Sequence, residues 1–428
     1  MMKLKNYGRI GENLYTAVLP NGLSLNVAVK PGFQLSYAVF ATNYGGANRR
    51  FFLDGQWHDT PAGVAHFLEH KMFDMPDGDN ALNILSANGA QPNAFTSSGM
   101  TAYYFDCTKG FEENLRMLLT FVSTPYFTQE SVDKEQGIIG QEICMVEDSP
   151  GYAIYNRLMR LLYAHHPIRD QVAGSVESIA EISADTLYNC HRVFYRPSNM
   201  TLCVAGDVDP ERIYAIADEL LTKETGEVPQ TDFGEAESEY PSAQYIEEHM
   251  EVSAPQFLIG AKIKPAPNGT ELLRQKIVSQ LALRTVFGSS SGFYIKLYGE
   301  GILNRDYDYE CDFTAGTATV IIGGESAEPQ RVLSEINALV ADISENGIDG
   351  EAFSRAKNAS FGSRLRGLED FDNLCIALAQ GSFGGYCALD SFEILESVTK
   401  EECERFIVEN LAADRLAMSV VLPVKQGE

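Results

Sequence analysis

Long apolar runs are missing from this 428-residue sequence. No segment reaches the 18 uncharged apolar residues that a membrane-spanning helix needs, and the N-terminal stretch has no apolar core of signal-peptide length. The eight cysteines are scattered, with no C-x-x-C pair and no dense framework. We therefore expect a soluble cytoplasmic protein with free thiols and no membrane partner.

Basic side chains are scarce beside acidic ones, 33 against 59, which gives a formal charge of −26. Such a charge repels nucleic acid phosphates and anionic membranes, so we expect no nucleic acid partner. Solubility is the simpler explanation of the acidic excess, and a negatively lined cavity that favours basic peptides is the alternative. The apolar fraction of 45% is typical of a globular enzyme, and the length indicates at least two domains.

Histidine is also scarce, with seven in the chain and none after His249. Two of them stand in GVAHFLEHKMF, residues 63–73, which otherwise has the composition of apolar core. His66 and His70 are four apart and share one helix face, with Glu69 beside that face. A core helix with a hydrogen-bonded histidine pair is one interpretation. A zinc site is the other, and it requires a third protein ligand.

Strand and helix patterns follow one another without regular alternation, which favours the α+β class. Asn21-Gly22 separates two alternating stretches and predicts a β-hairpin. A turn-rich acidic segment has the composition of a linker, and the order of strands and helices loosely repeats beyond it, so we expect two similarly built domains. The predicted divisions are a metal-binding domain at 1–222, a linker at 223–243 and a second domain at 244–428.

The order H-x-x-E-H reverses the H-E-x-x-H zinc motif and is the inverzincin signature. From about residue 15 to 215 the chain resembles the insulinase, pitrilysin and mitochondrial processing peptidase family, most closely its half-length bacterial YmfH-type branch. The resemblance implies two domains, each a mostly antiparallel sheet packed with helices. It also implies a zinc endopeptidase that holds one Zn²⁺ per chain and hydrolyses peptides or leader segments. The stretches that carry it are GVAHFLEHKMF, GAQPNAFTSSGMTAYYF, TPYFTQESVDKEQGIIGQEICMVEDSPGYAIYNRL, HPIRDQVAGSVESI and FYRPSNMTLCVAGDVDPE.

The same resemblance supplies the third metal ligand, a glutamate on a neighbouring helix. Glu142, 72 residues after His70, matches it, and Glu135 matches a second family glutamate seven positions earlier. Seven residues are close to two turns, so both carboxylates share one stripe of the helix predicted at 129–148. The residues by themselves leave Glu147 and Glu135 open as the ligand.

These matches imply roles for the remaining carboxylates. Glu69 would be the general base and then the general acid, and Glu135 would orient a metal ligand or substitute for it. Gly137 and Gly140 lie inside the predicted helix, and each costs about 1 kcal/mol relative to alanine. We expect a close approach of the histidine helix at these glycines, with a break in the helix as the alternative.

The segment NAFTSSGMTAYYF has strand character, and its family counterpart is an edge strand to which a substrate peptide adds by backbone pairing. Asn93, Ala94, Phe95 and Thr96 match the substrate-binding positions. Pro92, just before them, suits an edge strand but not a central one. An ordinary core hairpin is the alternative.

The second half departs from the family pattern at the substrate clamp. Family enzymes carry an Arg and, seven residues later, a Tyr, contributed by the opposite half of the assembly. Here Tyr298 stands at the place of the Arg and Arg305 near that of the Tyr. We therefore expect a homologous, metal-free partner chain that supplies the clamp in a heterodimeric clamshell, with a homodimer as the alternative. A non-catalytic scaffold subunit and a peptide-binding chaperone are the competing functions.

Overall fold

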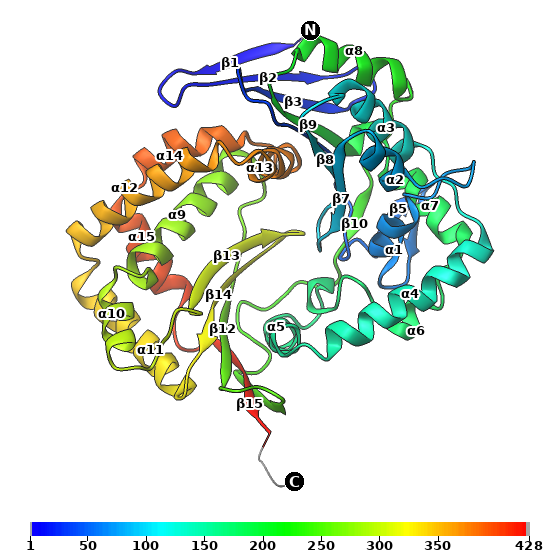
Figure 1. Ribbon diagram of the computed structural model, residues 1–428. Helices are drawn as coiled ribbons and strands as arrows, with labels where there is room; N and C mark the ends of the chain where they lie inside the picture. The colour runs from blue at the N-terminus through cyan, green and yellow to red at the C-terminus, as the bar shows by residue number, and fades with distance from the viewer. Residues whose placement is uncertain (1, 425–428) are drawn as a thin grey trace. The chain divides into compact units, whose positions relative to one another are not determined.

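The computed structural model describes residues 2–424, which form two compact units (Figure 1). No helix in this part of the chain is both long and apolar enough to span a bilayer. Unit 1 consists of the chain up to Ile143, Gln171–Phe233 and Leu365–Leu389. Unit 2 consists of Cys144–Asp170, Gly234–Arg364 and the chain from Asp390 onward.

Unit 1 is built on a seven-stranded sheet with the order β1-β2-β3-β9-β4-β8-β7 (Figure 1). The hairpin predicted at Asn21-Gly22 is confirmed, because β2 and β3 pair antiparallel on either side of it. Gly22 has a φ of 91°, and a Cβ there would lie 2.8 Å from that of Ser198, so this turn needs glycine. The strands are β1 (Lys3–Tyr7), β2 (Glu12–Val18), β3 (Ser24–Val29), β4 (Ser36–Thr42), β7 (Ala90–Thr96), β8 (Thr101–Cys107) and β9 (Met200–Gly206).

Helices of unit 1 bury their apolar faces against this sheet, and all of them except α13 contribute to one continuous core. Helix α3 packs on β4 and β8, α1 on β7, and α13 on β9 and β4. The last four residues of α4, from Cys144 to Glu147, belong to unit 2. The helices are α1 (Val64–Lys71), α2 (Ala81–Ala87), α3 (Phe111–Ser123), α4 (Gln129–Glu147), α6 (Val176–Ile179), α7 (Ala184–Phe194), α8 (Pro210–Leu220) and α13 (Phe371–Gly384).

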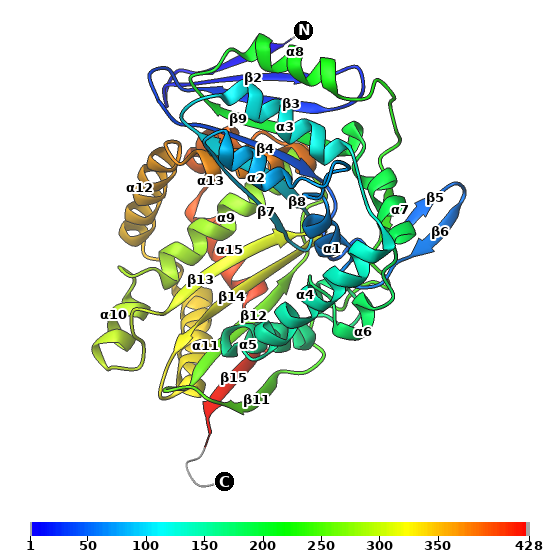
Figure 2. The ribbon, with the colours of Figure 1, turned by 45° about the vertical axis from the view of Figure 1, so that its right-hand side comes forward.

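Unit 2 is built on a five-stranded sheet with the order β11-β15-β12-β14-β13 (Figure 2). Helix α5 packs on β12 and β15, and a Cβ at Gly260 of β12 would lie 2.9 Å from Cδ1 of Leu162 in α5. The strands are β11 (Tyr245–Met250), β12 (Gln256–Ile263), β13 (Asp308–Thr314), β14 (Thr317–Glu325) and β15 (Ala417–Pro423). The helices are α5 (Pro150–Leu162), α9 (Gly269–Phe287), α10 (Gly292–Gly299), α11 (Pro329–Asn346), α12 (Gly350–Gly367), α14 (Ser391–Ser397) and α15 (Lys400–Asn410).

The two sheets share one topology. In unit 1 the strands β3-β9-β4-β8-β7 begin with a parallel pair and continue antiparallel. In unit 2 the strands β11-β15-β12-β14-β13 do the same, with β11 and β15 as the parallel pair. The predicted α+β class and the two similarly built halves are therefore confirmed.

The compact units do not follow the predicted divisions at 222 and 244, because they exchange two segments. Helix α5 comes from the first half of the chain and belongs to unit 2, whereas α13 comes from the second half and belongs to unit 1. Helix α5 packs on β12 and β15 of unit 2, and α13 packs on β4 and β9 of unit 1. These two strand pairs occupy the same position in the two sheets. An amphipathic sequence shows that a helix has an apolar face but not which sheet that face covers.

The acidic segment predicted as a linker is partly ordered. Strand β10 (Gln230–Asp232) joins β5 (Arg50–Leu53) and β6 (Gln56–Asp59) in a small sheet of unit 1. In unit 2, the Glu237 carboxylate accepts the backbone N–H groups of residues 164–166. Burial alone would raise the pKa of Glu237, but these hydrogen bonds and the nearby Lys262 have the larger effect and lower the pKa to about 2.

Candidate metal centre

Helix α1 presents three polar side chains beside a buried apolar face. Val64, Ala65, Phe67 and Leu68 are buried in the core, whereas His66, Glu69 and His70 are partly exposed. The imidazole rings of the two histidines lie 4.6 Å apart between centroids. The helix begins after Gly63, which has a φ of 97°. A Cβ at this position would lie 2.5 Å from the Ala173 carbonyl oxygen, so only glycine fits here.

Helix α4 lies beside α1 in both ribbon views and brings a carboxylate to the histidine pair (Figure 1, Figure 2). Glu142 Oε1 is 3.6 Å from His66 Nε2, and Glu142 Oε2 is 3.6 Å from His70 Nε2. These separations are too long for good hydrogen bonds. Ligands about 2 Å from a tetrahedral zinc are about 3.3 Å from one another. All three donor atoms lie within 4.8 Å of one another, so the set fits a zinc ion.

Glu135, two turns before Glu142 on α4, fixes the orientation of His70. His70 Nδ1–H donates to Glu135 Oε1 at 3.1 Å, which leaves Nε2 of that ring as an acceptor. Lys71 Nζ is 3.9 Å from Glu135 Oε2 and also binds Asp74. The hydrogen bond to His70 holds the pKa of Glu135 below its usual range, against the effect of burial. Glu135 is therefore an ionised carboxylate behind the ligand set.

The electrostatics of the histidine pair favour a cation between the rings. Burial and the neighbouring His70 lower the pKa of His66 to about 4, so that ring is neutral, as a metal ligand must be. Burial also lowers the pKa of His70, but Glu135, Glu142 and Glu69 raise it more. Three carboxylates thus surround the rings, and a divalent ion would balance their charge.

Glu69 lies beside the ligand set and is held by the neighbouring strand. Thr96 Oγ1 on β7 donates to Glu69 Oε2 at 2.6 Å, and Thr101 Oγ1 lies 3.3 Å beyond it. Burial raises the pKa of Glu69 despite this hydrogen bond and the nearby His70. A carboxylate with a raised pKa next to a metal site suits proton transfer.

The four predicted substrate-binding residues lie on β7, which ends the seven-stranded sheet of unit 1. Within the described residues β7 pairs only with β8. Asn93 is exposed, and Ala94, Phe95 and Thr96 are partly buried. The prediction of an edge strand is therefore confirmed, and Pro92 is compatible with it because its missing N–H is tolerated at an edge.

Neither the close approach expected at the two glycines of α4 nor the alternative, a break in that helix, is found. Helix α4 runs unbroken from Gln129 to Glu147, and a Cβ at Gly137 or Gly140 would meet nothing within 4 Å. The expected close approach at the glycines is thus wrong, because α1 faces α4 on the side that carries Glu135 and Glu142.

In unit 2, Tyr298 is exposed on α10 and stacks on Tyr294.

The other histidines bind main-chain groups or single carboxylates. His191 donates from Nε2 to the Val122 carbonyl at 3.0 Å, and His249 donates from Nδ1 to that of Pro423 at 3.0 Å. His166 Nδ1 accepts the N–H of Ile168, which caps a short 3₁₀ turn. Among the described residues only His66, His70 and Glu142 form a group of three potential ligands.

Sequence reasoning missed two supporting contacts. Thr96 was predicted as a substrate residue, but its hydroxyl binds Glu69. Lys71, adjacent to His70 in sequence, is 2% exposed and lies against Glu135. A lysine inside an apolar motif is the signal that could have indicated a buried carboxylate partner.

Comparison with known proteins gives consistent matches along the chain. The family described as "Insulinase (Peptidase family M16)" matches residues 53–176, and "Peptidase M16 inactive domain" matches residues 181–360. The Bacillus subtilis protein named "Uncharacterized zinc protease YmfH" is 38% identical over 99% of this chain and 100% of its own length.

Solved structures agree with this. A crystal structure of an M16-like peptidase from Alicyclobacillus acidocaldarius superposes with a TM-score of 0.92 at 33% identity, covering 96% of this chain and 99% of that one. Pitrilysin shares the fold, with a TM-score of 0.79 at 14% identity, and the match covers 99% of this chain but 46% of pitrilysin. On the similarity to its zinc protease relatives, the chain belongs to the insulinase family of peptidases, M16.

Proposed function

We propose that this protein is a zinc-dependent endopeptidase that hydrolyses peptides or leader segments. The observation that carries the proposal is the arrangement of four side chains. His66, His70 and Glu142 converge as a ligand set, while Glu69 stays outside the set, bound to the strand that would hold a peptide. A metal site needs the first three, and hydrolysis needs the fourth.

His66 Nε2, His70 Nε2 and one oxygen of Glu142 would hold a single zinc ion. When bound there, zinc supplies Lewis acidity that acidifies water and polarises a peptide carbonyl. Glu69 takes the proton from the attacking water and passes it to the leaving amine. Thr96 keeps the Glu69 carboxylate in place, and Glu135 keeps the His70 ring in the tautomer that leaves Nε2 available.

A substrate peptide would pair with the free edge of β7. Backbone pairing draws its affinity from main-chain hydrogen bonds and so accepts many sequences. Asn93, Ala94, Phe95 and Thr96 would lie along the peptide, and Thr96 links that strand directly to Glu69. An extended peptide on β7 therefore places its backbone next to the proton-transfer group.

A quenched fluorescent peptide tests the proposal when its products are identified by mass spectrometry. We expect cleavage at internal bonds that a chelator abolishes and added zinc restores. A folded protein of similar sequence content should remain uncut. Saturable peptide binding without products would instead indicate a chaperone, and neither binding nor products would indicate a scaffold subunit.

The contact between Glu135 and His70 gives a prediction about metal affinity. Glu135→Ala should weaken zinc binding about 10- to 100-fold, because His70 loses the partner that orients its ring. Turnover should recover in large part at saturating zinc, since Glu69 is untouched. Zinc titration against a competing chelator measures the change. Glu130→Ala, an exposed residue of the same helix, is the matched control, and equal losses in both variants would contradict the role.

We also propose that the full enzyme contains a second chain. The clamp positions hold Tyr298 and Arg305 in place of the family's Arg and Tyr, and this chain matches about half of pitrilysin. A homologous, metal-free chain would supply the clamp, so that four similar domains enclose a chamber. Free thiols suit a reducing compartment, and we place this assembly in the cytoplasm.

The partner proposal predicts that the isolated chain is slow. Adding a homologous chain that carries the Arg and Tyr pair should raise peptide turnover by about 10²-fold, because the clamp positions the substrate. Turnover is measured alongside the molar mass from light scattering. Full activity of the isolated chain as a monomer would contradict the proposal.

A further inference from the structure

The shared topology of the two units defines a place in unit 2 that corresponds to the metal centre. In unit 1, α1 lies between β4 and β7 in the chain, and α4 follows β8 and α3. In unit 2, α9 lies between β12 and β13, and α12 follows β14 and α11. Since β13 occupies the sheet position of β7, the elements α9, α12 and β13 correspond to α1, α4 and β7.

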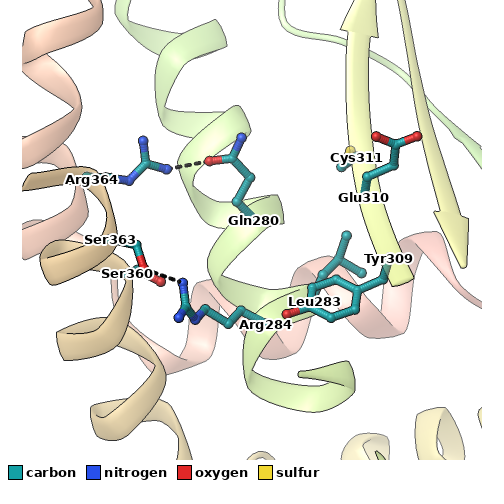
Figure 3. Close-up of a pocket in the computed structure, with 9 residues that line it drawn as sticks. All are labelled: Gln280, Leu283, Arg284, Tyr309, Glu310, Cys311, Ser360, Ser363 and Arg364. Carbon is teal, nitrogen blue, oxygen red and sulfur yellow. Dashed lines mark hydrogen bonds between the residues drawn. The ribbon is translucent and has the colours of Figure 1, made fainter. Parts of the chain in front are cut away.

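A cavity of about 500 Å³ opens at this place (Figure 3). Gln280 and Arg284 face it from α9, four positions apart as His66 and His70 are on α1. Helix α12 contributes Ser360, Ser363 and Arg364, and β13 contributes Tyr309, Glu310 and Cys311. The place that holds metal-ligand side chains in unit 1 therefore holds two guanidinium groups in unit 2.

Neither guanidinium is neutralised within residues 2–424. Arg364 Nη2 donates to Gln280 Oε1, and Arg284 Nη1 makes a long contact of 3.4 Å to Ser363 Oγ (Figure 3). Arg364 Nε is buried and has no hydrogen-bond partner. Burial, followed by repulsion from Arg284, lowers the pKa of Arg364. Leaving a buried charged donor without a partner is unfavourable, because the donor has lost its hydrogen bonds to water and gained none in the protein.

The acidic residue of the cavity does not pair with these arginines. Figure 3 shows Glu310 on the strand side, apart from both guanidinium groups. Burial raises the pKa of Glu310, and so do Asp312 and Asp308 on the same strand. Two unpaired arginines are unexpected in a chain with 59 acidic and 33 basic side chains, where carboxylates are plentiful. Arg355, on the same helix as Arg364, does have a carboxylate partner in Glu351.

We propose that this cavity binds the C-terminal carboxylate of a peptide. Two guanidinium forks can hold one carboxylate by parallel N–H···O bonds, including a bond from the unpaired Nε of Arg364. Leu283 and the ring of Tyr309 line the space beside the arginines and would receive the terminal side chain. Strand β13 ends the sheet of unit 2, so the preceding residues can pair with its edge as an added strand.

The choice of a peptide as ligand rests on the proposed function, whereas the preference for a carboxylate rests on the two arginines alone. The test therefore measures binding without turnover. Full-length zinc-loaded protein carrying Glu69→Gln is titrated by calorimetry with an unstructured peptide that has a free C-terminal carboxylate. The same peptide as its C-terminal amide, and inorganic phosphate, are titrated in parallel.

The free acid should bind at least about tenfold more tightly than the amide, in line with the strength of charge-assisted bidentate pairs. This preference should disappear in Arg284→Gln/Arg364→Gln and persist in Arg355→Gln. The single variants Arg284→Gln and Arg364→Gln are measured as well, so that a folding defect in the double variant leaves the test decisive. Equal binding of acid and amide, or a preference that survives in the arginine variants, would overturn the proposal. Binding of phosphate with no preference for the acid would overturn the assignment to a peptide.

Discussion

Glu69→Gln should leave one zinc per chain in place and slow peptide hydrolysis by about 10²- to 10⁴-fold. The substitution keeps the shape of the side chain and an oxygen that can accept from Thr96. It removes the group that takes a proton from the attacking water, and this is the usual size of a general acid–base contribution. His66, His70 and Glu142 form the ligand set without it, so the metal should remain.

His70→Ala is the variant that completes this comparison. It removes a ligand atom and should lose zinc and hydrolysis together. Metal content from mass spectrometry and turnover of the quenched peptide are measured on the same preparations. Retained turnover in Glu69→Gln would show that another group moves the proton.

Glu142→Ala should lower zinc affinity by more than about 100-fold. Removing a residue that only hydrogen-bonds a metal ligand already lowers metal affinity about 10- to 100-fold, and Glu142 would bind the metal itself. Its carboxylate oxygens lie 3.6 Å from the two imidazole Nε2 atoms, and Glu142 forms a group of three potential ligands with the two histidines. Two imidazoles alone leave zinc short of the three protein ligands found in hydrolytic sites. Activity should fall with the metal and should not return at moderate zinc concentrations.

Glu147→Ala is the matched control for that prediction. Glu147 is an exposed carboxylate at the end of the same helix, and the sequence alone left it open as the third ligand. The Glu147→Ala variant should bind zinc and cleave peptide as the unaltered protein does. A loss of zinc in Glu147→Ala with none in Glu142→Ala would exchange their roles.

Local patterns predicted the parts of the structure that local forces determine. Asn21-Gly22 predicted a hairpin because few residues adopt the backbone of that turn, and the four-residue spacing of His66 and His70 predicted one helix face. The choice of Glu142 came from the family resemblance, and the structure places it against both histidines. The seven-residue spacing of Glu135 and Glu142 predicted that both lie on one face of their helix, and Glu135 does contact His70.

Features that depend on distant parts of the chain were not predictable in this way. Strand β9 inserts between β3 and β4 from more than 150 residues away, and no periodicity encodes that neighbour. The same holds for the exchange of α5 and α13, whose apolar faces fit either sheet by pattern. Arg284 and Arg364 are 80 residues apart in the chain and line one cavity only because the fold brings α9 and α12 to it.

Zinc content and peptide cleavage, measured together on one sample, test whether His66, His70 and Glu142 hold the metal that hydrolysis requires. The protein should contain about one zinc per chain and cleave internal peptide bonds, and it should lose both properties on chelation and recover both when zinc is added back. A chain that cleaves equally well after its metal has been removed, or that binds no zinc at His66, His70 and Glu142, would contradict this assignment.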